Sequence, residues 1–237
     1  MTKDAHSKIK EYYSKARPIP SALFENNKYT FLGYNNIVEI GYLDINDIIQ
    51  SNKSDVLDSY ISRFGQVLLF PNRINGEIVN LFIRPLNEKT ALLKLGNSSF
   101  PYNMGNLAAG FKFGDPIILV EGIADLGALK LLDPSLNIIA MQSVSIPNEY
   151  YVFLQGLTDK VIILNDNDKA GNIAKFKTAK TLQAYKITPK IVDQYAGLKD
   201  TGDILDKMLL YLKTKRQDIK EELELIKLYY LSQLSEF

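Results

Sequence analysis

Two apolar runs of β type, each followed by acids, constrain the fold of this chain more than any other feature. The first run occupies residues 116–120 and is followed by Glu121 and Asp125. The second occupies residues 161–164 and is followed by Asp166 and Asp168. Strands that are apolar along their whole length are buried on both faces, as in parallel sheets. We therefore expect two parallel strands that carry acids at their carboxyl ends.

Strand and helix patterns alternate from about residue 115 onward. Apolar strand-like segments lie at residues 117–121, 138–141, 160–165 and 190–193, and helical patterns at residues 123–132, 147–155, 170–185 and 201–212. This alternation predicts an α/β unit, a Rossmann-like parallel sheet with helices on both faces. Ligands of such sheets bind beyond the carboxyl ends of the strands, where we expect Glu121, Asp166 and Asp168.

The segment before residue 115 has a different pattern. Runs of β type at residues 66–71 and 77–84 flank Asn75-Gly76, a dipeptide typical of two-residue hairpin turns, and residues 90–95 predict a third antiparallel strand. Shorter strands are expected at residues 29–32 and 37–40, and helices at residues 7–17 and 44–60. We expect a basic α+β subdomain over residues 1–114, the α/β unit over 115–206 and a helical segment over 207–237.

Basic side chains are spread through the antiparallel segment. Their spacing allows several to share one face of the sheet, and they are Arg63, Arg73, Arg84, Lys89 and Lys94. One interpretation is a solvated sheet face, and the other is a surface that contacts phosphates. Because the net charge of the chain is only +1, nucleic-acid binding would have to come from such local clustering.

The C-terminal segment, residues 214–237, has the pattern of a charged amphipathic helix. Its apolar stripe is expected to comprise Leu223, Leu225, Ile226, Tyr229, Tyr230 and Leu234. The stripe fits a helix that covers the core, and it also fits a helix that docks onto a partner.

Composition limits the cofactors. The chain has no cysteine, which excludes disulfides, iron–sulfur clusters and cysteine-bound zinc, and its one histidine, His6, lies near the amino terminus. Any metal ion is therefore expected to be held by oxygen. No apolar run approaches the length of a membrane span and the first residues do not resemble a secretory signal, so we expect a cytoplasmic protein.

The acids themselves indicate a divalent cation. Carboxylates at adjacent strand ends repel one another unless a cation neutralises them, and an oxygen-only set suits Mg²⁺ or Mn²⁺. Gly171 would let the following helix begin close to the acids. A third acidic motif contains Asp200 and Asp203, although Asp200 or Thr201 could equally be a helix N-cap.

Together, in this order and spacing, these motifs resemble the Toprim domain, the metal-binding α/β unit shared by bacterial-type primases, topoisomerases and some nucleases. The resemblance rests on Val-Glu-Gly-Ile-Ala-Asp with Glu121 and Asp125, on Asp-Asn-Asp-Lys-Ala-Gly with Asp166 and Asp168, and on Lys-Asp-Thr-Gly-Asp with Asp200 and Asp203.

The preceding segment is similar to the basic half of the DnaG-type primase catalytic core. The similar stretches are Arg63-Phe64 and residues 67–71, 76–79, 84–86 and 94–98, so that the resemblance spans about residues 8–206. Three places depart from the family pattern: Ile83 replaces a glycine, Gly96 replaces an apolar residue, and Thr201-Gly202 replaces a single proline. These departures suggest a phage or plasmid member.

The resemblance implies synthesis of short RNA primers from NTPs on a single-stranded DNA template, with Mg²⁺ or Mn²⁺ in a two-ion site. It implies catalytic and metal-binding roles for Glu121, Asp166 and Asp168, with Asp125, Asp200 and Asp203 as further metal ligands or supports. Contacts to template or NTP are implied for Arg63, Arg73, Arg84, Lys94, Asn97, Lys169 and Lys199. Implied partners beyond the substrates are a replicative helicase and a zinc-binding primase subunit acting in trans, but no membrane.

Two other functions remain open. A Toprim-type nuclease would use the same metal ions to activate water, although its small members begin with the Toprim strand, whereas more than 100 residues precede it here. A non-catalytic primase-like protein would bind nucleic acid or a replication partner through the C-terminal helix.

Overall fold

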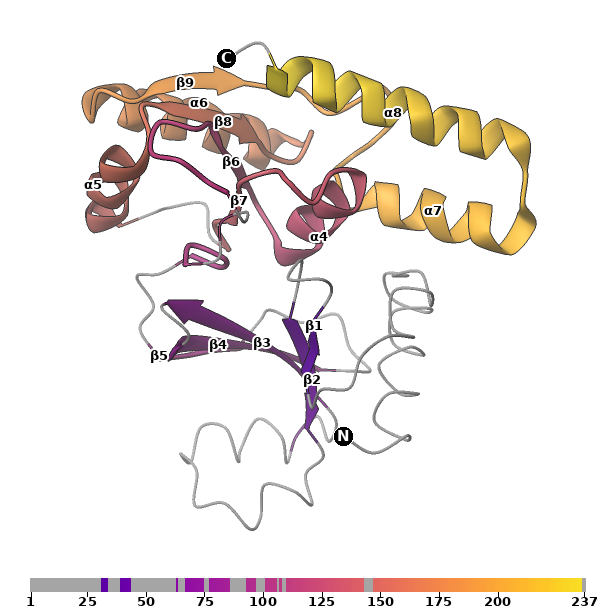
Figure 1. Cartoon of the computed structure of the whole chain (residues 1–237), viewed down its shortest axis with the longest axis horizontal. Coiled ribbons are helices and arrows are strands. Elements are labelled where there is room, and N and C mark those ends of the chain that lie inside the picture. Colours follow the sequence, from indigo (N-terminus) through magenta and orange to yellow (C-terminus); the bar gives the residue numbers. More distant parts are fainter. Residues whose placement is uncertain are drawn as a thin grey trace. The chain divides into compact units, whose positions relative to one another are not determined.

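The chain divides into two compact units, residues 1–98 and residues 99–237, each with its own sheet (Figure 1). This computed structural model describes residues 31–33, 39–43, 63, 67–74, 77–85, 93–96, 101–105, 107, 110–142 and 147–235. The helices expected at residues 7–17 and 44–60 lie outside the described residues.

The first unit contains a five-stranded antiparallel meander. In sheet order the strands are β1 (Phe31–Gly33), β2 (Glu39–Leu43), β3 (Val67–Ile74), β4 (Glu77–Pro85) and β5 (Leu93–Gly96). Ile74 pairs with Glu77, so a connection of two residues joins β3 to β4, as predicted. The hairpin and the third strand beside it are confirmed, while the turn residues themselves lie outside the described part.

The second unit contains a four-stranded parallel sheet in the order β7-β6-β8-β9. Its elements along the chain are β6 (Ile117–Val120), α4 (Ile123–Leu132), β7 (Ile138–Ala140), α5 (Asn148–Leu157), β8 (Lys160–Leu164), α6 (Lys169–Ala184) and β9 (Thr188–Ile191). The chain moves outward from β6 to β7 and then returns past β6 to β8. Right-handed crossovers therefore place α4 on one face of the sheet and α5 and α6 on the other. The predicted α/β class is confirmed.

The two central strands of this sheet are buried along almost their whole length because helices cover both faces. A cluster that includes Ile117, Leu119, Val161 and Ile163 packs against apolar side chains of α5 and α6, and Tyr151 of α5 stacks on Tyr185 at the end of α6. Such a covered sheet holds its strand ends, and hence the acids that follow them, in fixed positions.

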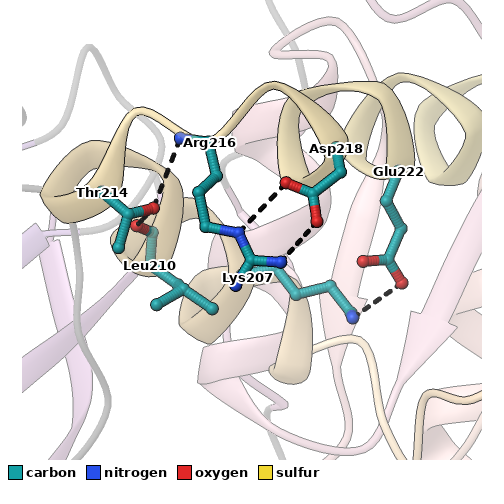
Figure 2. Close-up of polar contacts among 6 residues, drawn as sticks. All are labelled: Lys207, Leu210, Thr214, Arg216, Asp218 and Glu222. Atoms are coloured by element: carbon teal, nitrogen blue, oxygen red, sulfur yellow. Dashed lines mark hydrogen bonds and ion pairs between the residues drawn. The ribbon is translucent and has the colours of Figure 1, made fainter.

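Two helices, α7 (Asp203–Thr214) and α8 (Gln217–Ser235), follow the sheet and run side by side as a hairpin (Figure 1). The connection is tight because Lys215 adopts a left-handed conformation with φ of 54°. Figure 2 shows the polar contacts that fasten it: Arg216 pairs with Asp218, and Lys207 of α7 pairs with Glu222 of α8 at 2.7 Å.

Two expectations about this region were wrong. The last strand lies at Thr188–Ile191, two residues earlier than expected, because this partly exposed edge strand lacks a continuous apolar run. In α8 the fully buried side chains are Ile219, Ile226 and Tyr230, whereas Leu225 is 54% exposed. Among the described residues, no helix combines the length and apolarity needed to cross a bilayer.

Candidate active site

Four acids from three loops lie at the carboxyl end of the parallel sheet. Glu121 directly follows β6, Asp166 follows β8 after one intervening residue, and Asp168 is the N-cap of α6. Asp200 lies in the loop that enters α7. The sequence prediction that the two apolar strands deliver acids to one edge therefore agrees with the parallel pairing of β6 and β8.

Backbone hydrogen bonds tie these segments to one another. The amide of Asn167 donates to the carbonyl of Lys199 at 2.7 Å, which joins the loop after β8 to the loop before α7. On the other side, the amide of Gln142 at the end of β7 donates to the carbonyl of Glu121 at 2.9 Å. The acids thus lie on loops that are fixed by their neighbours.

Asp125 links α4 to the α7 loop. Its Oδ2 accepts from the amide of Gly122 at 2.9 Å, and its Oδ1 accepts from the Thr201 hydroxyl at 3.0 Å and the Gly202 amide at 2.9 Å. The side chain is 6% exposed. Both carboxylate oxygens are therefore engaged in holding two segments together that are more than 70 residues apart in sequence.

Asp200 and Asp203 form a reciprocal pair at the entry to α7. The Asp203 amide donates to Asp200 Oδ1 at 3.1 Å, and Asp203 Oδ2 accepts from the amides of Lys199 at 2.7 Å and Asp200 at 3.4 Å. This is the arrangement of a capping box, so Asp200 does cap the turn that leads into α7. The capping role does not exclude an electrostatic one, because Asp200 also raises the pKa values of Glu121 and Asp166.

Gly171 lets α6 begin directly beside Asp166. A Cβ on Gly171 would lie 2.2 Å from the backbone oxygen of Asp166, a distance that real contacts do not allow. The Gly171 amide donates to Asp168 Oδ1 at 2.8 Å, so Asp168 caps the helix as well as lying next to the acids. The expectation that Gly171 permits a close start of the helix is confirmed, whereas the capping role of Asp168 was not foreseen.

The electrostatics of the site disfavour ionisation. Burial, followed by the charges of Asp125, Glu121 and Asp200, raises the pKa of Asp166 to about 7. Burial and the neighbouring acids also raise the pKa of Glu121, and Lys199 acts in the opposite direction on both groups. Carboxyls with raised pKa values at one strand edge are typical of functional sites.

The donor chemistry of the site suits a hard divalent cation. It offers carboxylate oxygens whose mutual repulsion a cation would relieve, and no sulfur or imidazole. In the part of the chain that the structure describes, no group of three or more acidic or histidine side chains is arranged to hold a metal ion.

Sequence analysis did not find two polar side chains beside the acids. Gln142 has a positive φ of 56°, and its Nε2 is buried without a hydrogen-bond partner among the described residues. Asn165 is 1% exposed, and its Oδ1 likewise has no partner within the described part. Only their positions could have drawn attention to them, because Gln142 lies two residues after β7 and Asn165 lies one residue before Asp166.

A buried chain of hydrogen bonds runs from α8 to the residue before Asp166. The Tyr230 hydroxyl donates to Gln194 Oε1 at 2.6 Å, and Gln194 Nε2 donates to the carbonyl of Asn165 at 2.9 Å. The Tyr230 hydroxyl also accepts from the amide of Tyr195 at 3.2 Å. The C-terminal helix is therefore attached to the core close to the acids, as the core-covering interpretation predicts.

The predicted basic residues lie in both units. In the first unit, strand register places Arg84 and Lys94 on the same face as Phe82, and the Lys94 Nζ lies 5.1 Å from the centre of the Phe82 ring. Burial lowers the pKa of Lys94, and the Arg84 Nε is buried with no hydrogen-bond partner among the described residues. A solvated sheet face does not describe these two side chains.

The other basic residues are less informative. Arg63 is exposed, Arg73 belongs to β3 just beyond an irregularity in its pairing with β4, and Asn97 lies outside the described residues. In the second unit Lys169 is exposed at the start of α6 and Lys199 is exposed beside the acids.

Comparison with known families identifies the class of the second unit. The model of the Toprim-like family matches residues 118–205, which include every acid of the site. These residues therefore resemble a Toprim-like domain.

Comparison with whole proteins finds similarity to DNA primases. The chain is 28% identical over 176 residues to a DNA primase of Staphylococcus epidermidis and 25% identical over 157 residues to a DNA primase of Staphylococcus aureus. These matches cover 68% and 59% of this chain, but only 28% and 24% of the length of the two relatives.

Solved structures share the fold. The catalytic core of Escherichia coli primase superposes with a TM-score of 0.61 at 15% identity, over 97% of this chain and 85% of that one. The RNA polymerase domain of Mycobacterium tuberculosis primase DnaG gives 0.59 at 18% identity, over 93% and 76% of the two chains. A DnaG catalytic domain bound to single-stranded DNA gives 0.61 at 17% identity, over 92% and 71%. The resemblance to a DnaG-type Toprim primase core is therefore confirmed.

Proposed function

We propose that this chain is the catalytic core of a DNA primase, which joins ribonucleotides on a single-stranded DNA template. In this reaction the 3′-hydroxyl oxygen of one nucleotide bonds to the α-phosphorus of an incoming NTP. The bond to the β-phosphate breaks, and pyrophosphate and the hydroxyl proton leave. The DNA primase relatives and the shared DnaG fold support this proposal.

The observation that carries the proposal is the group of acids at the carboxyl end of β6 and β8, in which the pKa of Asp166 is raised to about 7. Such a group is unfavourable in a metal-free protein, and its position is where α/β sheets bind ligands. A group of acids that repel one another, placed beside a buried core, favours a chemical role over a structural one.

Glu121, Asp166 and Asp168 would hold Mg²⁺ or Mn²⁺, with Asp200 and Asp203 beside a second ion. When bound, such ions lower the pKa of the attacking hydroxyl and offset the charge of the phosphates. Asp125 would position the other acids rather than bind an ion, because three hydrogen bonds already occupy its oxygens. Lys199, which opposes the raised pKa values of Glu121 and Asp166, would contact the triphosphate together with Lys169.

Arg84 and Lys94 would contact the template through its phosphates, with Arg63, Arg73 and Asn97 as further contacts. Phosphate contacts position a strand without selecting its sequence. The buried Nε of Arg84, which has no hydrogen-bond partner among the described residues, and the lowered pKa of Lys94 support this role, since a phosphate would stabilise the positive charge of both side chains.

The test is incorporation of labelled NTPs on single-stranded DNA with Mg²⁺ or Mn²⁺. We expect RNA products from the wild type and at least a hundredfold less product from Asp166→Ala. The matched control is Asp159→Ala, which removes an exposed carboxylate just before the other end of the same strand. This variant should retain wild-type activity.

Other products would assign other functions. Metal-dependent cleavage of the template that is lost in Asp166→Ala would replace the primase proposal with the Toprim nuclease. Metal-independent products, or equal losses in Asp166→Ala and Asp159→Ala, would refute a catalytic role for the acids. Binding of DNA without any chemistry would favour the non-catalytic alternative.

A further inference from the structure

Apart from Lys169, to which a contact with the triphosphate is assigned above, helix α6 carries an exposed surface that the proposed reaction does not use. Its first residue follows Asp168, and five of its exposed side chains share one face: Lys169, Ile173, Phe176, Lys177 and Lys180. In a helix of 3.6 residues per turn, each of these side chains points within about 50° of another one in the set, so the five form one stripe along the helix. We refer to these five residues as the α6 stripe.

Two large apolar side chains of the α6 stripe face solvent. Ile173 is 62% exposed and Phe176 is 65% exposed. Because they are three residues apart in the sequence, their side chains are neighbours on the helix surface. The buried side of α6 is complete without them, because Ala174, Thr178, Ala179 and Leu182 pack toward the core. Adjacent exposed apolar side chains of this size indicate an interaction surface.

The charge of α6 defines the occupant. The helix contains four lysines and no acid, and its one buried lysine, Lys175, pairs with Asp193 at 2.8 Å. Within the described residues, Lys169, Lys177 and Lys180 make no ion pair. The stripe therefore presents three positive charges beside a flat aromatic ring.

Helix α8 provides an internal comparison. It also exposes two apolar side chains three residues apart, Leu225 at 54% and Leu228 at 63%. However, that helix contains one aspartate and three glutamates against two lysines. Of these two helices, α6 alone combines an exposed apolar pair with lysines and no acidic residue.

We infer that the α6 stripe binds single-stranded nucleic acid, with lysines on the phosphates and Phe176 against a base. Sequence-independent sites for single strands combine cationic side chains with aromatic rings on which bases stack. The stripe begins beside the acids, and at 1.5 Å per residue it extends for about 16 Å, which is about five nucleotides of a stacked strand. This inference rests on the proposed function, because a polymerising site needs a strand that leads to it or away from it.

The experiment measures binding separately from chemistry. The full chain carrying Asp166→Ala, which cannot polymerise, is titrated into a labelled single strand of about 16 nucleotides, and fluorescence anisotropy gives Kd at several salt concentrations. Adding Phe176→Ala should raise Kd about tenfold, as expected for the loss of one stacked base. Its control is Leu228→Ala on α8, which should change Kd less than twofold.

The charge test uses paired double variants. Lys177→Ala with Lys180→Ala should reduce the slope of log Kd against log salt by about 1.4, since each phosphate contact of a single strand contributes about 0.7. Lys213→Ala with Lys220→Ala removes the same charge from exposed positions of α7 and α8 and should leave the slope nearly unchanged. All four residues are exposed, so the variants should keep the wild-type Tm.

Several results would overturn the inference. They are the absence of single-strand binding by the parent protein, equal effects of the α6 and control variants, and unaltered binding by every α6 variant. The last result, combined with capture of an acidic peptide by the α6 stripe, would make the occupant a protein instead. If the α6 variants weaken single-strand binding while the wild-type protein makes no RNA, the inference about the α6 stripe is upheld and the primase proposal fails.

Discussion

Replacing Tyr230 by phenylalanine tests how strongly the C-terminal helix is attached to the core near the acids. The variant keeps the buried ring and removes only the hydroxyl, which donates to Gln194 at 2.6 Å and accepts from the Tyr195 amide at 3.2 Å. Gln194 is 7% exposed, so water does not replace the lost donor. A buried acceptor left without its donor costs about 1–3 kcal/mol.

We therefore expect Tyr230→Phe to lower the free energy of unfolding by about 2 kcal/mol. For a chain of this size this loss corresponds to a fall in Tm of about 4–8 °C. The neighbouring Tyr229 is the matched control, because its hydroxyl also donates one hydrogen bond, to the backbone carbonyl of Asp193 at 3.0 Å, but in an exposed position. Water can replace that bond, so Tyr229→Phe should cost about 0.5 kcal/mol or less.

The assay is urea unfolding followed by far-UV circular dichroism, combined with a double-mutant cycle. Gln194→Met removes the acceptor, so Tyr230→Phe should cost less in that background, with a coupling energy of at least about 1 kcal/mol. Hydrogen exchange supplies the local readout, because the amides of residues 165–168 should exchange faster in Tyr230→Phe and not in Tyr229→Phe. Equal costs of the two tyrosine variants, or strict additivity with Gln194→Met, would refute the proposed chain of hydrogen bonds.

Two further predictions concern the acids directly. Gly171→Ala should destabilise the protein by about 1–3 kcal/mol, because its Cβ would overlap the Asp166 carbonyl, whereas Gly156→Ala in open space on α5 should stabilise it by about 0.5–1 kcal/mol in the same unfolding assay. The pKa of Asp166 is 3.8 in the unfolded chain and about 7 in the folded protein. Without divalent cations, protonated Asp166 therefore contributes its full stabilisation below pH 3.8, and this contribution is lost as the pH rises through about 7. The free energy of unfolding of the wild type should thus fall across this range relative to Asp166→Asn, and Mg²⁺ at about 100 times its Kd should restore about 2.7 kcal/mol at pH 8. An identical pH profile in Asp166→Asn, or no effect of Mg²⁺, would contradict the raised pKa or the metal site.

The parallel sheet was predictable because its signals are local. The bounds of α4 agree with the sequence prediction residue for residue, since Gly122 and Asp125 mark its start and an apolar strand precedes it. The strand β9 was misplaced because Thr188-Pro189-Lys190-Ile191 is polar enough to serve as a partly exposed edge, where a proline is tolerated. Apolar runs therefore identify central strands and miss edge strands.

The C-terminal helix shows where periodicity loses precision. A broad apolar stripe predicted that Leu225 faces inward, but the fully buried positions are Ile219, Ile226 and Tyr230, which form a narrower line. Helix α8 contacts α7 and the end of β9. A helix that packs against so few elements buries only some of the apolar residues in its sequence. The exposed Leu225 is the consequence.

The different roles of the acidic residues could not be predicted from their spacing in the sequence. Sequence placed Glu121, Asp125, Asp166, Asp168 and Asp200 together, yet it could not distinguish a carboxylate that faces a ligand from one that holds the loops. Asp125 accepts hydrogen bonds from Thr201 and Gly202, whereas burial and neighbouring charges raise the pKa of Asp166 to about 7. Because these partners are more than 70 residues from Asp125, no local pattern records them. A site of repelling carboxylates needs such uncharged donors to fix its loops, and the donors around Asp125 hold the segment after Glu121 against the loop that carries Asp200.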